Sequence, residues 1–232
     1  NMEFDTAKFM TAVSEALQSR DTQAFVDTVK EQCTLADLCR MLDEGDIDTR
    51  RVAAIALGLI GDQSVEDYLF RALKDEDRQV NKMAEHGLWA IWFKSGKSGA
   101  MPAFKRGVDQ LESNEYKAAL VSFKEAATID PNFAEAYNQC SIVYYLLGKW
   151  DKSLKYCQKA LAQIPRHFGA MAGLGHCYTQ KGDFRRALTH YRMAHQINPN
   201  VNAVLAAIER LQARVRDAND SSDHFAQEKV GV

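Results

Sequence analysis

Apolar residues recur at helical spacing along most of the chain, and in the C-terminal half the whole pattern returns every 34 residues. Three prolines, Pro131, Pro165 and Pro199, fall on this step. The other columns that keep it are Leu120, Leu154 and Leu188; Ala126, Ala160 and Ala194; Gly107, Ser141 and Gly175; Ala119, Ser153 and Ala187; Tyr116, Trp150 and Phe184; and Phe123, Cys157 and Tyr191. A repeat of this length, with small residues where two helices meet and a proline after the second helix, predicts a stack of antiparallel helix pairs.

The N-terminal half has a different repeat, of 31 residues. It is carried by the pairs Leu38 and Leu69, Leu42 and Leu73, Asp46 and Asp77, Thr49 and Val80, Ala53 and Ala84, Leu57 and Leu88, and Ile60 and Ile91. The clearest copy runs from Asp48 to Asp62, and a second runs from Asp77 to Trp92. Acidic residues in the connecting turns are expected to cap helices. Apolar stretches within residues 4–30 predict a degenerate first helix pair or a cap.

A segment of turn-forming residues separates the two repeats. Lys94 to Pro102 contains two glycines, two serines and a proline, which predicts a turn or linker. We therefore expect one helical repeat domain over residues 1–95 and a second over residues 100–218. Apolar residues on one face of residues 202–217 predict a helix that caps the second array. The polar residues 219–232 predict a disordered tail.

The composition is that of a folded protein, because 46% of the 232 residues are hydrophobic and 26% are charged. No run of about 18 apolar residues occurs, so we expect no membrane-spanning helix. The first residues lack the basic and then apolar pattern of a secretory signal, and the five cysteines include no Cys-x-x-Cys pair. Both observations favour a cytoplasmic protein with reduced thiols.

Charge is divided unevenly between the two halves. Residues 1–95 contain 11 basic and 18 acidic residues, whereas residues 96–232 contain 18 and 13. This asymmetry predicts two units with different partners, or units that attract one another, as in a homo-oligomer. A basic stretch from Lys181 to Arg216 makes nucleic-acid binding an alternative, although neither half is basic enough to indicate nucleic acid on charge alone.

The 34-residue pattern resembles the tetratricopeptide repeat (TPR) family over residues 100–200, with three copies, tight turns at Asn114, Gly148 and Gly182, and a proline after each second helix. The 31-residue pattern resembles the short HEAT-like repeat of bilin-lyase-type proteins over residues 33–93. It departs from that repeat at Asn81, where an arginine is usual, and at Gly87, where an alanine is usual. Together the resemblances imply an all-α, right-handed α-solenoid, in which HEAT-like repeats precede three TPR helix pairs and a capping helix.

Motifs for catalysis or metal binding are not found in the sequence. Gly96-Lys97-Ser98 matches the end of a phosphate-binding loop, but Ile91 stands where the loop requires a glycine. The six histidines form no His-Glu-x-x-His motif and pair with no cysteine at zinc spacing. Cys140 and Cys157 fall in columns that are usually buried, so we expect core thiols. We predict no catalytic residues, no metal site and no cofactor.

The TPR resemblance implies that the first helix of each pair lines a concave groove that binds peptides. The residues at those places are Phe104, Val108, Leu111, Asn138, Ile142, Tyr145, Ala172, His176 and Thr179. Receptors for the EEVD tails of chaperones carry Lys, Asn, Asn, Lys and Arg in this groove, whereas this chain has Phe104, Val108, Gln139, Gly169 and Gly173. A carboxylate there would lose water without gaining a charged partner, so chaperone tails are not the expected ligand.

These features predict a non-enzymatic scaffold or adaptor that binds a protein or peptide partner in the groove. The groove is also suited to the chain's own tail or to a second copy of the protein, or it is idle. Two further alternatives stay open. One is a bilin-lyase-like protein that handles a chromophore, which rests on the HEAT-like resemblance. The other is a helical repeat protein that binds nucleic acid.

Overall fold

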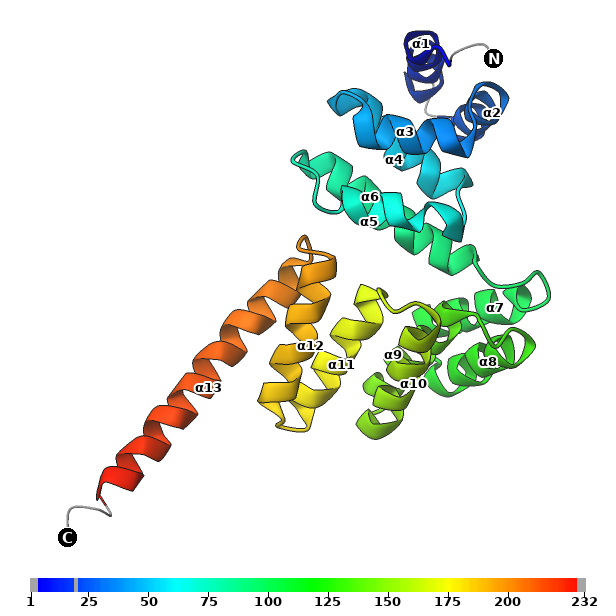
Figure 1. Cartoon of the computed structure of the whole chain (residues 1–232). Helices are drawn as coiled ribbons and strands as arrows, with labels where there is room; N and C mark the ends of the chain where they lie inside the picture. Colours follow the sequence, from blue (N-terminus) through cyan, green and yellow to red (C-terminus); the bar gives the residue numbers. More distant parts are fainter. Residues whose placement is uncertain (1–3, 19–20, 229–232) are drawn as a thin grey trace. The chain divides into compact units, whose positions relative to one another are not determined.

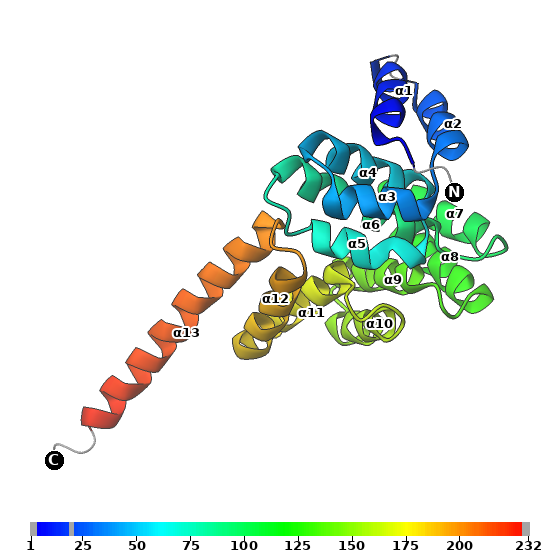
Figure 2. The ribbon, with the colours of Figure 1, turned by 45° about the horizontal axis from the view of Figure 1, so that its top comes forward.

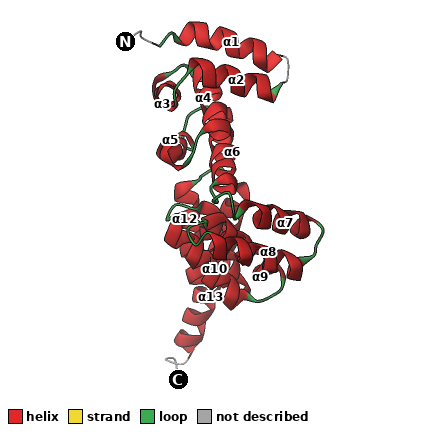
Figure 3. Cartoon of the chain, turned by 90° about the vertical axis from the view of Figure 1, so that its right-hand side faces the viewer, coloured by secondary structure: helices red, strands yellow, loops and turns green. Residues whose placement is uncertain are grey.

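The computed structural model describes residues 4–18 and 21–228. In these residues it contains thirteen α-helices and one short 3-10 helix, and no strand (Figures 1 and 3). The prediction of an all-α protein is confirmed. Contacts between residues divide the chain into two compact units, residues 1–95 and 96–232.

Acidic or hydroxyl side chains cap the starts of several helices in the first unit. The helices of this unit are α1 (Thr6–Gln18), α2 (Thr22–Gln32), α3 (Leu35–Glu44), α4 (Ile47–Ile60), η1 (Gln63–Val65), α5 (Glu66–Ala72) and α6 (Arg78–Lys94). Asp46 and Asp77, one repeat apart, accept hydrogen bonds from the first backbone N–H groups of α4 and α6. The guanidinium of Arg51 also bonds Asp77 and lowers the pKa of this carboxyl group to about 2.

Helices α4 and α6 approach one another closely in the middle of this unit. A Cβ atom added to Gly58 would lie 2.7 Å from the Cα atom of Gly87. Gly87 is the residue at which the second HEAT-like copy departs from alanine. The departure therefore has a structural reason, because the backbones of the two helices meet here. Leu57 and Leu88, one repeat apart, are completely buried beside this crossing.

The second unit is a stack of antiparallel helix pairs. Its helices are α7 (Met101–Glu112), α8 (Tyr116–Ile129), α9 (Ala134–Leu146), α10 (Trp150–Gln163), α11 (Phe168–Gln180), α12 (Phe184–Ile197) and α13 (Asn202–Glu228). The turns inside the three pairs are at Asn114, Gly148 and Gly182, where φ is 61°, 68° and 76°. This left-handed conformation favours glycine and asparagine, which explains the residues seen at this step of the repeat.

Helix α13 is longer than the predicted capping helix. Val204, Ala207, Ile208 and Leu211 are buried on its inner face, which packs against α12. The helix continues to Glu228 and extends past the ends of α11 and α12 (Figures 1 and 2). The predicted disordered tail from residue 219 therefore differs from the structure over residues 219–228, and residues 229–232 lie outside the described residues.

Small residues permit the close packing inside each pair. A Cβ atom added to Gly107 would lie 2.7 Å from the ring of Phe123, and one added to Gly175 would lie 2.7 Å from the ring of Tyr191. In the middle copy the same place is Ser141, whose carbonyl oxygen accepts a 2.7 Å hydrogen bond from the hydroxyl of Ser153. The aromatic rings thus occupy space that a side chain on the first helix would need.

A buried polar cluster joins the second and third pairs. Glu135 on α9 and His167, just before α11, are both completely buried. The backbone N–H of Ala170 donates to Nδ1 of His167, so Nε2 of the ring donates to the Glu135 carboxylate at 2.9 Å. The amides of Asn138 and Gln139 donate to the other carboxylate oxygen. The buried carboxylate is therefore supplied with hydrogen-bond donors on both oxygens.

We predict that the second unit folds without the first. Repeats are stabilised mainly by contacts with their neighbours, so a fragment of residues 96–232 should show helical circular dichroism and a cooperative melt. It should be more stable than a fragment that starts at residue 100. The reason is that the N–H of Lys97 donates to the buried carboxylate of Asp130 at 2.9 Å. A fragment 96–232 without a cooperative melt would contradict this division.

We also predict that Gly175→Leu destabilises the protein by about 1–3 kcal/mol or more, because the new side chain must displace the ring of Tyr191. Urea denaturation followed by circular dichroism measures the change. The control is Gly99→Ala, since a Cβ atom there would meet its nearest neighbour, a methyl of Ile129, at an ordinary 3.5 Å. Equal stability of Gly175→Leu and the parent would mean that the helix pairing is different from the one described.

Candidate functional site

Six of the nine predicted groove residues reach the surface of the second unit. Ile142 on α9 has 38% of its surface exposed, and His176 on α11 is also exposed. Val108, Leu111, Tyr145 and Thr179 are half-buried. These six lie on one side of the first helices α7, α9 and α11, at places separated by the 34-residue step.

The other three predicted residues, Phe104, Asn138 and Ala172, are buried. Phe104 is only 1% exposed, and its ring centroid lies 4.6 Å from that of Phe133. Asn138 donates to Glu135, the carboxylate that holds His167. These three were wrong as surface residues.

The reason is a feature of the connecting loops. Phe133 and His167 stand one repeat apart, directly before α9 and α11, and both are buried. The ring of Phe133 packs on Phe104 of α7. His167 bonds Glu135 of α9, which in turn accepts a hydrogen bond from Asn138. One column of the predicted face therefore belongs to the packing between repeats.

Three residues of this face were missed. Leu146, one turn after Ile142, has 49% of its surface exposed, and Gln180 is exposed at the corresponding place on α11. Arg210 on α13 is exposed one repeat after His176. The 34-residue step leads from Ile142 to His176 and on to Arg210, so continuing the step into α13 would have found Arg210. Leu146 and Gln180 lie one helical turn after the predicted Ile142 and His176 and are themselves one step apart. We call the resulting set the first-helix surface: Val108, Leu111, Ile142, Tyr145, Leu146, His176, Thr179, Gln180 and Arg210.

Side chains of neighbouring pairs touch on the first-helix surface. The side-chain amide of Gln180 donates to the hydroxyl oxygen of Tyr145 at 3.0 Å. The rings of Tyr145 and His176 lie 6.0 Å apart between centroids. His176 Nδ1 is 2.7 Å from the hydroxyl oxygen of Tyr191 on α12, and a hydrogen bond joins them. The surface is therefore continuous from α9 to α11.

The chemical character of the first-helix surface changes along the array. It is apolar on α9, at Ile142 and Leu146, and polar on α11. It becomes positively charged at Arg210 on α13. Although part of the His176 side chain is exposed, desolvation by the atoms around its imidazole, and then the positive charge of Arg210, lowers the pKa of His176 below its ordinary 6.5. The imidazole is therefore neutral at neutral pH. A partner on this surface would meet apolar contacts first, then hydrogen-bonding groups, then a cation.

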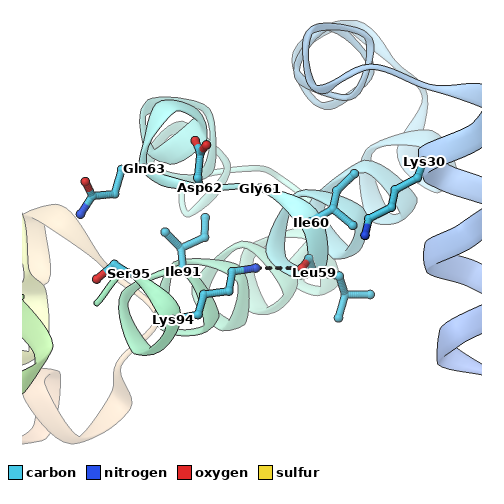
Figure 4. Close-up of a pocket in the computed structure, with 9 residues that line it drawn as sticks. All are labelled: Lys30, Leu59, Ile60, Gly61, Asp62, Gln63, Ile91, Lys94 and Ser95. Atoms are coloured by element: carbon cyan, nitrogen blue, oxygen red, sulfur yellow. Dashed lines mark hydrogen bonds between the residues drawn. The ribbon is translucent and has the colours of Figure 1, made fainter. Parts of the chain in front are cut away.

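The first unit contains a cavity of about 660 Å³ between the ends of α4 and α6 (Figure 4). The ammonium group of Lys94 lies in it and donates to the backbone oxygens of Gly58 and Leu59, at 3.0 and 2.8 Å. Burial lowers the pKa of Lys94. Because the ammonium group already bonds the last carbonyls of α4, its role is to cap that helix.

Two buried cysteines of the second unit have weakly acidic thiols. Burial raises the pKa of the Cys140 and Cys157 thiols to about 12, so both are protonated and poor nucleophiles. Within the described residues no three histidine, cysteine or acidic side chains are arranged to hold a metal ion. A search of the same residues finds no helix with the length and apolar character needed to cross a bilayer.

Comparison with known families matches both halves of the chain. Models described as "Tetratricopeptide repeat" and "TPR repeat" match residues 132–200 and 110–148, and one described as "HEAT repeats" matches residues 35–122. The HEAT match covers the predicted repeat of residues 33–93 from residue 35 onward and extends into the first helix pair of the second unit.

Curated relatives share the repeats and differ in length. Anaphase-promoting complex subunit 3 of Schizosaccharomyces pombe is 29% identical over 111 residues, which are 48% of this chain and 17% of that protein. Protein bimA of Emericella nidulans is 35% identical over 91 residues, 39% of this chain and 11% of that protein. A TPR repeat-containing protein of Rhizobium etli is 26% identical over 134 residues, 57% of this chain and 66% of that protein. The chain thus spans a small part of the first two relatives.

Solved structures with the same fold are TPR domains. The Sgt2 TPR domain from Aspergillus fumigatus has a TM-score of 0.51 at 18% identity and covers 53% of this chain, which matches 83% of that domain. The first TPR domain of the human RPAP3 protein has a TM-score of 0.50 at 16% identity over 53% of this chain and 96% of that domain. At this level of identity the likeness establishes the fold alone.

The lowered pKa of His176 predicts a pH dependence of stability. The unfolded chain binds a proton at this residue more readily than the folded one, so the free energy of unfolding should fall as the pH drops below about 6.5. His176→Gln should reduce that fall, as measured by urea denaturation across this range. Burial also lowers the pKa of His190, so His176→Gln with His190→Gln should reduce it further. The same pH dependence in His176→Gln and the parent would contradict the assignment.

Proposed function

We propose that this chain, in which residues 110–148 and 132–200 match tetratricopeptide repeat models and residues 35–122 match a HEAT repeat model, is a non-enzymatic, cytoplasmic scaffold whose first-helix surface binds a segment of a partner protein. Two relatives are named as subunits of the anaphase-promoting complex, a name that denotes an assembly of proteins. A role in holding proteins together agrees with those names.

The observation that carries the proposal is the pair of exposed apolar side chains on α9. Ile142 and Leu146 are one helical turn apart and 38% and 49% exposed. Tyr145 lies between them in sequence and is held by Gln180 from the next pair. Large apolar side chains at the centre of a polar surface are typical of sites that bind proteins, because their contact with water is unfavourable until a partner covers them.

The surface is suited to a partner that requires little rearrangement of the scaffold. Tyr145 and His176 are already fixed by contacts with Gln180 and Tyr191. Binding would therefore restrict the partner and leave the conformational entropy of the scaffold nearly unchanged. The best partner segment has an apolar side chain for α9 and hydrogen-bonding groups for α11.

Chaperone EEVD tails do not fit this proposal. At the places of the basic and amide clamp the chain has Phe104 and Gln139, both buried, and Val108, Gly169 and Gly173. Gln139 already donates to Glu135 at 2.7 Å. A terminal carboxylate would find no charged partner at these places.

The alternatives weighed from the sequence have less support. The repeat matches point to helical repeats in both halves, and no contact among the described side chains favours bilin handling over protein binding. Most of the basic residues that suggested nucleic acid lie on α12 and α13, whereas Ile142 and Leu146 lie on α9. Self-association through the same surface is an outcome that the experiment below can detect.

We predict that Ile142→Glu with Leu146→Glu abolishes binding of the main partner and leaves the fold intact, because both side chains are exposed. Loss of such anchors typically costs about 2 kcal/mol or more of binding free energy. The measurement is affinity capture by the intact protein from the cells that produce it, followed by titration of the captured partner against each variant.

The matched control is Val121→Glu with Ile129→Glu. These side chains are 66% and 45% exposed but lie on α8, a second helix of a pair. The control adds the same charge at equally apolar, exposed places. If the parent, the control and the α9 variant all retain the same partners, the first-helix surface is excluded as the binding site. Sedimentation that depends on concentration in the parent alone would identify a second copy as the occupant.

A further inference from the structure

The clearest unassigned feature of the second unit is a wedge between α12 and α13. Two adjoining cavities of about 670 and 490 Å³ lie there, and they share Arg185 from α12 and Val215 from α13. The wedge lies between the N-terminal half of α12 and the part of α13 that follows its buried residues. It shares no residue with the first-helix surface.

The floor of the wedge is apolar. Leu188 is buried, and Phe184 and Val215 are half-buried and pack against the core of the last repeats. The guanidinium of Arg214 lies over the ring of Phe184, 5.0 Å from its centroid. An apolar side chain of a ligand that entered the wedge would therefore contact Leu188 and Val215, with a cation beside it.

The rim of the wedge is strongly basic. It carries Lys181, Arg185, Arg192, Arg214 and Arg216. The one acidic residue of the wedge is Asp183, which already pairs with Arg186 at 3.3 Å, and Lys181 pairs with Asp151. Among the side chains that the structure describes, no carboxylate pairs with the four arginines of the rim.

We infer that the α12–α13 wedge binds an acidic segment of a partner protein in which carboxylates flank one apolar or aromatic side chain. The carboxylates would pair with the arginines of the rim, whose planar guanidinium groups are suited to bidentate bonds with carboxylates. The apolar side chain would cover Leu188 and Val215. Repulsion among the basic side chains of the rim favours such a ligand, because binding neutralises them.

A peptide fits the wedge better than a nucleic acid does. Sequence-tolerant binding of single strands relies on aromatic faces on which bases stack. The aromatic ring of the wedge, Phe184, has the Arg214 guanidinium over it, and the rest of the floor is aliphatic. The aliphatic floor suits an apolar side chain and the basic rim suits carboxylates, so the wedge is complementary to an acidic, amphipathic peptide.

A second copy of this chain fits less well, although residues 1–95 carry the excess of acidic residues. Many of those carboxylates already have partners within the first unit. Asp21, Asp46, Asp62 and Asp77 accept hydrogen bonds from backbone N–H groups at helix starts, and Asp75 pairs with Arg50. An arginine rim would have to compete with these bonds, whereas a flexible acidic segment has free carboxylates.

The test uses the whole chain and a fluorescein-labelled peptide in which one phenylalanine is flanked on both sides by glutamates. We expect saturable binding by fluorescence anisotropy that weakens as salt is added. Arg185→Glu with Arg214→Glu should weaken it about tenfold or more. A control peptide with glutamines in place of the glutamates should bind the parent protein only weakly. Its affinity should be similar to that of the acidic peptide for the Arg185→Glu, Arg214→Glu variant.

The matched control is Lys117→Glu with Lys155→Glu, which makes the same change of charge at exposed places on α8 and α10. It should bind the acidic peptide nearly as the parent does. If Arg185→Glu with Arg214→Glu loses its helical circular dichroism, Arg192→Glu with Arg216→Glu provides the same test.

Three results would overturn the inference. The first is no binding of the acidic peptide by the parent, or equal binding by the parent and both rim variants. The second is tighter binding of labelled oligothymidine than of the peptide, with loss in the same rim variants, which would assign the wedge to nucleic acid. The third is self-association of the parent, by sedimentation, that the rim variants abolish. The α9 variants proposed above should bind the acidic peptide normally, so failure of one proposal is distinguishable from failure of the other.

Discussion

The second unit depends on how closely the two helices of each pair can approach. In the first and third pairs a glycine faces a large ring, Gly107 facing Phe123 and Gly175 facing Tyr191. In the middle pair the first helix has a larger residue, Ser141, and the second helix has a smaller one, Cys157, which it faces. The combined volume of the two facing side chains therefore fits the space between the helices in each pair. In the first unit, α4 and α6 approach closely because Gly58 and Gly87 face one another where the two helices cross.

Once the pairs are packed, the loops between them decide which side chains of the first helices reach solvent. Phe133 and His167 turn inward at the same step of the repeat and cover the column of Phe104 and Asn138. One turn further on, Ile142 and Leu146 remain exposed. The first-helix surface is therefore what remains after packing between repeats has used part of the helical face.

Charge is used differently in the two units. Acidic residues of the first unit begin helices and bond arginines within that unit, as Asp77 does with Arg51. At the end of the second unit arginines face a wedge whose described neighbours leave them unpaired, while Arg210 extends the positive charge toward His176. Partners of the two surfaces would for this reason differ in chemistry, apolar on α9 and acidic at α12–α13.

The sequence by itself determined the helical repeats and the turns at Asn114, Gly148 and Gly182, because these follow from local spacing and from backbone preferences. It did not reveal that Phe104 is buried or that Leu146 and Arg210 share the surface with Ile142. Periodicity places a side chain on a face of its own helix, but exposure depends on what another repeat places over it. Only the tertiary structure decides that, because the covering residue lies on a loop about thirty residues away in the chain, such as Phe133 over Phe104.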